Sequence, residues 1–510
     1  MPEEIDNATE ERKKKIKAWL SNPYNLALVG LIILAFAIRL YYFNITKYQP
    51  LWWDEAEYMI KANNLAFGTP ETGWWGEGRP VLFPFLASLF FKAGLGEISI
   101  RFIWVILSTL NILLIYLIGK KLINERVALF AAAVMSFSYI DLFYTSRLLV
   151  DLPQVFFILL ATFFFLKSNT EELNKKAVYY VLPILFLGTL MRFTVGLFII
   201  ILLVFLLFIH GFKLFKKKEW YISTILGVVV FIPYMIYSQI TYGNPFKAFL
   251  VFLASERGPN FNPIDVLKQY ISYLPSYLSG FLFLFFLLGL GLIIFNLFIR
   301  YDLIKKEGNS SKHYLFILLW FFVPLLYFGL AVNHFEDRYL FMALPPMFFF
   351  VGLGLDKLLE WIKKYNKIIA VIAIAVILIH GLYGMANHSS SIIKGKISSY
   401  KDLKDTGLWI KDNSSPGEAV ATGGVPEITY YSQRASYSIE QSLEEQLKSI
   451  KEKNIKYIVL TNLEKTPEWI ISYIQTNQTI FKPVHQSMTD YGNGAKSYAL
   501  VLSNNYRLVF

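Results

Sequence analysis

The sequence lacks cysteine and contains few histidines and charged residues. Among its 510 residues there is no cysteine, there are six histidines, and 17% are charged. The absence of cysteine excludes disulfide bonds, thiolate nucleophiles and cysteine-ligated metals. In contrast, 55% of the residues are hydrophobic, and many runs exceed the roughly 18 apolar residues that a membrane-spanning helix needs. The predicted fold class is therefore a polytopic α-helical membrane protein.

The net charge of +12 lies mostly in short basic clusters between the apolar runs. In that position the clusters indicate membrane orientation, with the basic side in the cytoplasm, and not a nucleic-acid partner. The N-terminal segment 1–23 carries such a cluster, which includes Arg12 and Lys17. The first apolar run, 24–43, lacks the small-residue pattern of a signal-peptidase site, so we expect a retained first helix and a cytoplasmic N-terminus.

Whether the run Pro80–Ala93 crosses the membrane determines on which side each later helix begins and ends. It is short and contains two prolines, and if it crossed the membrane every later basic cluster would lie outside. We therefore predict that it lies along the interface within an outer loop, about 44–97. About eleven spans remain, at about 24–43, 98–119, 126–140, 148–166, 177–190, 192–211, 220–241, 277–299, 313–332, 339–356 and 367–386.

These spans form a predicted transmembrane domain, 24–386, and residues 387–510 form a predicted extracytoplasmic α/β domain. In that domain we expect helices at 401–412 and 441–453 and strands at 419–422, 457–461 and 497–502. Gly423-Gly424 could cradle a phosphate, but without a complete glycine-rich fingerprint a plain turn between strand and helix is the favoured interpretation.

The stretch Leu51–Tyr58 places Asp54, Glu55 and Glu57 beside two tryptophans. Tryptophans favour the membrane interface, so this stretch is either a loop that they anchor or a charged site at the membrane surface. Because the predicted spans alternate in direction across the membrane, further charged residues lie on the same outer side as this stretch. They are Glu77, Arg79, Arg101, Asp141, Arg147, Asp151, Arg192, Glu256, Arg257, His334, Glu336, Asp337 and Arg338. Salt bridges between helix ends would explain any one of them, but the excess of arginines favours a site for an anionic ligand.

Individual members of this set allow two interpretations each. Arg147 and Asp151, spaced i,i+4, form either an ion pair on one helix or a pair in which Asp151 orients an arginine or a substrate hydroxyl. Arg338 and Tyr339 stand at a helix start, which favours anions. Arg257 lies in a long outer loop that either closes over a substrate or is an ordinary loop.

His334 has no diagnostic metal-ligand spacing with the acids that follow it. We expect a hydrogen-bonded structural histidine and no required cofactor, although a divalent metal is possible. The sequence therefore predicts no metal-binding residues.

In their order and common outer location, these motifs resemble the membrane glycosyltransferases that use polyprenyl-phosphate sugars. The motifs are the Asp-Glu of the first outer loop, Gly78-Arg79-Pro80, the Arg101 helix start, Arg147-Leu-Leu-Val-Asp151 and Arg338-Tyr339-Leu340. The nearest branches are the protein O-mannosyltransferases and the aminoarabinose transferases of lipid A, which share the GT-C fold. The resemblance covers about 40–390. Asp490-Tyr491-Gly492 echoes an oligosaccharyltransferase signature but lacks its tryptophans, so we expect a turn there.

The resemblance implies roles for these residues. Asp54 would be the catalytic carboxylate, Arg79 would contact the donor phosphate, and Arg257 and Tyr339 would assist. Asp151 matches a second acidic position. Gly78 stands where some relatives have a glutamate, so the second carboxylate is open between Glu55, Glu77 and Asp151. Arg147 and Arg338 join Arg79, Arg257 and Tyr339 as predicted ligands of the donor phosphate. Supporting roles are assigned to Glu77, Arg101, Arg192 and His334.

The function expected from the resemblance is transfer of a single sugar, with inversion, from a polyprenyl or dolichyl phosphate to an acceptor hydroxyl on the outer face. The partners would be this lipid-linked sugar, an acceptor glycan, lipid or protein, and membrane lipids. The alternative from another class is a transporter or lipid flippase, which predicts ionisable residues deep inside several spans and broken helices near the midplane. Most charges here lie at helix ends instead.

Overall fold

The computed structural model describes residues 10, 14, 17–72, 78–168, 175–255, 262–299, 311–476, 480–492 and 494–504. Two predicted site residues, Glu77 and Arg257, lie outside the described residues. The chain divides into two compact units. The first comprises Met1–Tyr42, Ile103–Thr145 and Val150–Ser391, and the second comprises Phe43–Phe102, Ser146–Leu149 and Ile392–Phe510.

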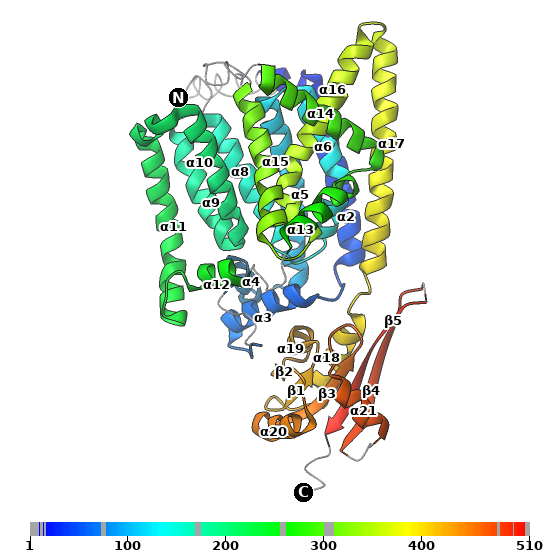
Figure 1. Cartoon of the computed structure of the whole chain (residues 1–510). Helices are drawn as coiled ribbons and strands as arrows, with labels where there is room; N and C mark the ends of the chain where they lie inside the picture. Colours follow the sequence, from blue (N-terminus) through cyan, green and yellow to red (C-terminus); the bar gives the residue numbers. More distant parts are fainter. Residues whose placement is uncertain are drawn as a thin grey trace. The chain divides into compact units, whose positions relative to one another are not determined.

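The first unit is a bundle of apolar helices (Figure 1). Nine helices among the described residues are long and apolar enough to cross a membrane. They are α2 (Pro23–Thr46), α5 (Glu97–Leu122), α8 (Asp151–Ser168), α10 with its flanking 3₁₀ turns (Phe193–Lys216), α11 (Lys218–Tyr242), α14 (Gly280–Ile299), α15 (Ser311–Ala331), α16 with the preceding η6 (Asp337–Lys363) and α17 (Lys367–Lys396).

Two further elements correspond to the remaining predicted spans. Helices α6 (Glu125–Phe137) and α7 (Tyr139–Thr145) form a pair bent by 53° that together passes the same test. Helix α9 (Val181–Met191), preceded by η1 (Lys175–Tyr180), is shorter but apolar. The connections hold α12 (Lys247–Ser255), α13 (Pro263–Tyr273) and η4 (Leu274–Tyr277). The prediction of a polytopic helical membrane protein is confirmed, and its count of about eleven spans is approximate.

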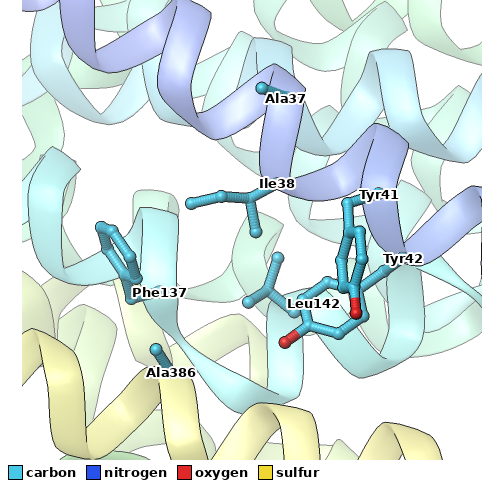
Figure 2. A pocket seen from close by; sticks show the side chains of 7 residues that line it. All are labelled: Ala37, Ile38, Tyr41, Tyr42, Phe137, Leu142 and Ala386. Carbon is cyan, nitrogen blue, oxygen red and sulfur yellow. The ribbon is translucent and has the colours of Figure 1, made fainter.

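An ion pair lies inside this bundle. Arg39 of α2 pairs with Asp141 of α7, whose carboxylate also accepts a hydrogen bond of 2.6 Å from Ser108 of α5. Nearby residues of α2, α6, α7 and α17 line an apolar pocket of about 350 Å³. Figure 2 shows Tyr41 and Tyr42 on one side of this pocket, with Leu142 between Tyr42 and Ile38. The pair thus ties three helices together through charge in otherwise apolar surroundings.

Helices α14 and α16 pack backbone against backbone. A Cβ at Gly289 would lie 1.9 Å from the carbonyl oxygen of Phe350, and one at Gly354 would lie 2.3 Å from that of Phe285. Non-bonded heavy atoms cannot approach this closely. Only glycine at these two positions therefore lets the partner helix lie at its observed distance. Small residues play this part widely in membrane helix packing.

The substitution Gly289→Ala should force α14 away from α16, because its methyl group meets a backbone carbonyl and not a movable side chain. We expect a cost of about 1–3 kcal/mol, as for other overpacked sites, seen as a lower melting temperature in detergent. Gly291→Ala on the same helix is the matched control, since nothing lies within 4 Å of its Cβ position. Equal melting temperatures for the two variants would contradict this packing.

The second unit contains α3 (Trp53–Phe67) and α4 (Leu82–Lys92). At 1.5 Å per residue, α4 is roughly 17 Å long, about half of what crossing a bilayer needs. Helix α4 is therefore too short to cross the membrane by itself.

The rest of the second unit is an α/β fold around a five-stranded sheet (Figure 1). In chain order its elements are α18 (Lys401–Asn413), β1 (Ala419–Thr422), α19 (Val425–Ser432), β2 (Ser436–Tyr437), α20 (Leu443–Lys453), β3 (Ile455–Thr461), α21 (Glu468–Thr476), β4 (Phe481–Asp490) and β5 (Lys496–Asn504). The sheet order is β2-β1-β3-β5-β4, with β1 parallel to β2 and β3, and β5 antiparallel to β3 and β4.

Alternation along β3 produces two cores, one on each face of the sheet. Ile458 packs with Ile450 of α20 and Ile470 of α21, while Val459 packs with Leu403 of α18 and Ile428 of α19. Successive strand residues point to opposite faces, so a strand buried on both sides must be apolar throughout. That continuous apolar run is why β3 was predictable from the sequence.

Three strands were predicted and three match, namely β1, β3 and β5. Strand β4 was missed because most of it is exposed and it contains Pro483, which interrupts the pairing register next to that residue. Both features are typical of an edge strand. The Asp490-Tyr491-Gly492 stretch forms the expected turn between β4 and β5, with Gly492 at a φ of 77°.

Candidate active site

Helix α3 begins at the stretch that opens the outer loop. Its first turn carries Asp54 and Glu55, where carboxylates interact favourably with the positive end of the helix dipole. The Glu55 carboxylate accepts a hydrogen bond of 2.9 Å from the backbone N–H of Trp52, which closes the helix start. The helix ends at Gly68, whose φ of 68° suits glycine. The two neighbouring acids of this first turn have different surroundings.

Glu55 is fully buried and its carboxylate holds a cluster of ion pairs. It pairs with Arg147 at 3.1 Å and with Arg101 at 3.8 Å, and it accepts a 2.6 Å hydrogen bond from the backbone N–H of Leu148. Both arginines are also buried. This cluster joins α3, the start of α5 and the segment Ser146–Leu149 within the second unit.

The two arginines of this cluster have further internal partners. Arg147 donates to the carbonyl oxygens of Pro50 and Lys396, and its guanidinium lies 3.7 Å from the Trp52 ring centre. Arg101 donates to the carbonyl oxygens of Ser146 at 2.6 Å and Gln49 at 3.4 Å. Buried charges with this many partners hold a fold together, so this geometry favours a structural role for Glu55, Arg101 and Arg147.

Asp54 lies at a more accessible position than Glu55. Its carboxylate pairs with Arg79 at 2.9 Å, and both side chains are 28% exposed. Arg79 comes from the turn before Pro80 and α4, and its guanidinium lies 5.8 Å from the Tyr58 ring centre. While Nη2 of Arg79 donates to Asp54, its Nη1 is buried without a hydrogen-bond partner. The pair thus places a carboxylate beside a guanidinium group of which Nη1 makes no hydrogen bond.

Glu57, which the sequence does not distinguish from its acidic neighbours, lies on the same helix. It is 1% exposed, and it accepts a hydrogen bond of 2.8 Å from the Thr72 hydroxyl. Burial raises the pKa of its carboxyl, and the Thr72 hydrogen bond opposes that rise. Asp54 and Glu57 are spaced i,i+3 and therefore lie on neighbouring positions of one face of α3. That spacing is the signal that could have identified Glu57.

The first unit holds a second group of predicted site residues. Asp151, in the first turn of α8, pairs with Arg192, which stands between α9 and α10. The Arg192 guanidinium lies 5.4 Å from the Tyr339 ring centre. Asp151 is fully buried, and its Oδ2 has no hydrogen-bond partner. This group again combines a carboxylate, an arginine and a tyrosine.

The interpretation of Arg147 and Asp151 as an i,i+4 ion pair on one helix is wrong. Residues 147–150 are not helical, and α8 begins only at Asp151. Arg147 pairs with Glu55, and Asp151 with Arg192. The i,i+4 rule applies only within a continuous helix, and the break at 147–150 removes it.

The remaining predicted residues lie around η6. Arg338 lies 3.6 Å from the Glu336 carboxylate, and it follows Asp337 in the first turn of η6, which leads directly into α16. His334 is exposed and hydrogen bonds to the Tyr339 hydroxyl at 3.1 Å. Among the described residues no group of three or more histidines, aspartates and glutamates could hold a metal ion.

The fold agrees with the comparisons to known proteins. The family model described as dolichyl-phosphate-mannose-protein mannosyltransferase matches residues 78–237, a stretch that begins just before Arg79 and includes Arg101, Arg147 and Asp151. The chain has the fold of the GT-C membrane glycosyltransferases, and the resemblance seen in its motifs is confirmed. No curated protein matches the whole sequence at a significant level.

Three solved structures illustrate this fold. ArnT from Cupriavidus metallidurans bound to undecaprenyl phosphate has a TM-score of 0.65 and 14% identity, over 93% of this chain and 98% of that one. AglB, the oligosaccharyltransferase from Archaeoglobus fulgidus in complex with an inhibitory peptide and a dolichol-phosphate, has a TM-score of 0.63 and 11% identity, over 96% and 75%. The mycobacterial arabinofuranosyltransferase AftD has a TM-score of 0.55 and 11% identity, over 93% and 40%.

Replacement of Glu55 by glutamine should destabilise the second unit, because two buried arginines lose the carboxylate that neutralises them. Breaking a buried pair in this way costs about 3–5 kcal/mol, which a melting curve in detergent would record. Asp405→Asn, which disrupts an exposed pair with Lys401, is the control and should cost under about 1 kcal/mol. If the two variants melted alike, Glu55 would not hold this cluster.

Proposed function

We propose that this protein is a glycosyltransferase that moves a single sugar from a polyprenyl or dolichyl phosphate to an acceptor hydroxyl. The observation that carries the proposal is the Asp54–Arg79 pair, in which a partly exposed carboxylate lies 2.9 Å from a guanidinium with one unused N–H group. The acceptor is a glycan, a lipid or a protein. The site lies on the outer face of the membrane, and the N-terminus lies in the cytoplasm.

The chemistry divides naturally between the two side chains. The acceptor oxygen attacks the anomeric carbon of the sugar while the bond from that carbon to the phosphate oxygen breaks. The Asp54 carboxylate takes the proton of the attacking hydroxyl. The lipid phosphate leaves with the bonding electron pair, and Arg79 neutralises its charge. A single displacement from the opposite face inverts the anomeric configuration.

Arginine suits this task because its planar fork can bind two acceptors at once. With Nη2 on Asp54, Nη1 of Arg79 can donate to a phosphate oxygen without breaking the existing pair. The base and the phosphate therefore stay close to one another throughout the displacement. Tyr58, whose ring lies beside the guanidinium, supports its position.

The comparisons support a lipid-phosphate donor. ArnT is described with undecaprenyl phosphate and AglB with a dolichol-phosphate and a peptide, and the matching family model is named for a dolichyl-phosphate sugar. In the first unit, Asp151, Arg192 and Tyr339 combine a buried acid, an arginine and an aromatic ring, and we propose this group as a polar binding group of its own. Arg338, Arg257 and His334 are proposed as further contacts of the donor. Glu77 is proposed as a support of Asp54.

Glu55, Arg101 and Arg147 are proposed to position the catalytic stretch and not to touch the substrate. Their polar atoms already contact one another and backbone carbonyls around the start of α3. Asp54 follows directly in this stretch, so the cluster sets the position from which its carboxylate acts.

The variant Asp54→Asn should lose sugar transfer from a polyprenyl-phosphate donor while keeping its fold. Loss of a general base reduces the rate by about 10²- to 10⁴-fold, measured as radiolabelled sugar transferred in detergent. Asp412→Asn, at an exposed position of α18, is the matched control and should retain full activity. Full activity of Asp54→Asn with an unchanged melting temperature would overturn the proposed function.

The variant Arg79→Lys keeps the charge but removes the planar fork. Because hydrogen bonds to charged groups contribute about 1.5–3 kcal/mol, we expect kcat/KM for the donor to fall on the order of 10- to 100-fold. Arg79→Gln should lose more. Lys448→Gln, on an exposed face of α20, is the control. If Arg79→Lys leaves donor kinetics unchanged, Arg79 does not bind the phosphate.

A further inference from the structure

Helix η3 (Gly211–Lys216), which joins α10 to α11, opens a basic segment of the first unit. Four of the six residues 213–218 are lysines, namely Lys213, Lys216, Lys217 and Lys218. All four side chains are exposed, and none pairs with a carboxylate among the described residues. By contrast, Lys120 at the end of α5 pairs with Glu125 at 2.5 Å. The charge of the segment is therefore not neutralised within the described chain.

The 3₁₀ geometry of η3 sorts its side chains into three rows. With three residues per turn, side chains at positions i and i+3 lie directly above one another. Phe212 and Phe215 form one row, with their ring centres stacked 6.4 Å apart, and they are 85% and 51% exposed. Lys213 and Lys216 form the second row, and Leu214 in the third row is buried. An aromatic row therefore lies beside a basic row on one exposed segment.

The segment stands where the chain leaves the hydrocarbon region. Helix α10 with the preceding η2 is about 27 Å long at 1.5 Å per residue, close to the roughly 30 Å of a bilayer core. Trp220 and Tyr221 follow in the first turns of α11, and these residue types favour the membrane–water boundary. The Tyr221 hydroxyl donates a 2.8 Å hydrogen bond to the carbonyl oxygen of Phe215, which ties η3 to α11. The aromatic row is thus in reach of acyl chains, and the lysines are in reach of headgroups.

Helix stability does not explain this concentration of lysines. Lys217 and Lys218 stand at the N-terminal end of α11, where the helix dipole disfavours positive charge. Four like charges within six residues also repel one another. An anion bound from outside the protein would relieve both costs.

We propose that the segment Phe212–Lys218 binds an anionic phospholipid of the surrounding membrane. Its phosphate lies against the basic row, and one of its acyl chains covers the aromatic row. A phospholipid carries a negative phosphate and hydrocarbon in one molecule, which matches the two neighbouring rows. A nucleic acid or an acidic peptide would match the lysines but would leave Phe212 and Phe215 uncovered. This binding needs neither a sugar donor nor an acceptor, so it does not rest on the proposed function.

The test uses the purified full chain in detergent, titrated with phosphatidylglycerol or with phosphatidylcholine of the same acyl chains. Native mass spectrometry counts the bound lipids. We expect the first phosphatidylglycerol to bind on the order of tenfold more tightly than phosphatidylcholine. The double variant Lys213→Gln/Lys216→Gln should abolish this preference. Lys448→Gln/Lys451→Gln, which removes the same charge from exposed positions of α20, is the matched control and should preserve it.

The aromatic row is tested in the same titration. Phe212→Ala/Phe215→Ala should weaken phosphatidylglycerol binding on the order of tenfold, because each variant side chain loses contact with an acyl chain. Phe295→Ala/Phe298→Ala is the matched control, since these two phenylalanines are also exposed and also three residues apart, on α14. Glycerol 3-phosphate, which has the phosphate but no acyl chain, should not displace the lipid.

Equal binding of the two lipids, or an unchanged preference in Lys213→Gln/Lys216→Gln, would overturn the proposal. Displacement of the lipid by glycerol 3-phosphate would also overturn it, in favour of a site for a soluble anion. An acidic peptide that displaces the lipid would overturn it in favour of a protein partner. Melting temperatures separate loss of binding from loss of fold. If the first lysine variant does not fold, Lys217→Gln/Lys218→Gln decides the question.

Discussion

The buried carboxylate of Glu55 is the interaction on which the candidate active site depends. It neutralises Arg147 and contacts Arg101, and it also accepts hydrogen bonds from the backbone at Trp52 and Leu148. Three segments that are distant in the sequence meet at this one group. Isolated buried charges are costly, so each segment can keep its charge only in this arrangement. The start of α3 is thereby held, and with it the backbone that carries Asp54.

The adjacent acids Asp54 and Glu55 on α3 consequently have different proposed roles. Successive helix residues point about 100° apart, so Glu55 faces inward to the two arginines while Asp54 reaches a partly exposed position beside Arg79. Glu57 lies on the same side of the helix as Asp54, about one turn further along. A single turn of helix therefore supplies a structural acid, a proposed base and a further buried acid that accepts a hydrogen bond from Thr72.

Much of the fold could be predicted because it follows from local patterns. Apolar length identifies the long helices, and the continuous apolar run of β3 identifies a strand buried on both faces. Exposed segments with mixed patterns, such as β4, could not be predicted, because their stability comes from the neighbouring strand. In the candidate site, Asp54 and Arg79 were predicted through the motifs that carry the family resemblance, and the structure pairs them. The sequence did not show that Glu55 is buried between two arginines, because only tertiary packing brings those residues together.

The sequence by itself determined the class of the protein, since many apolar runs long enough to span a bilayer are typical of a polytopic membrane protein. It also determined which residue types were available at the outer helix ends. Only the tertiary structure decided the pairing: Glu55 with Arg147, Asp54 with Arg79, and Asp151 with Arg192. The physical reason is that an ion pair depends on distance in space, and helix breaks and long-range packing set that distance.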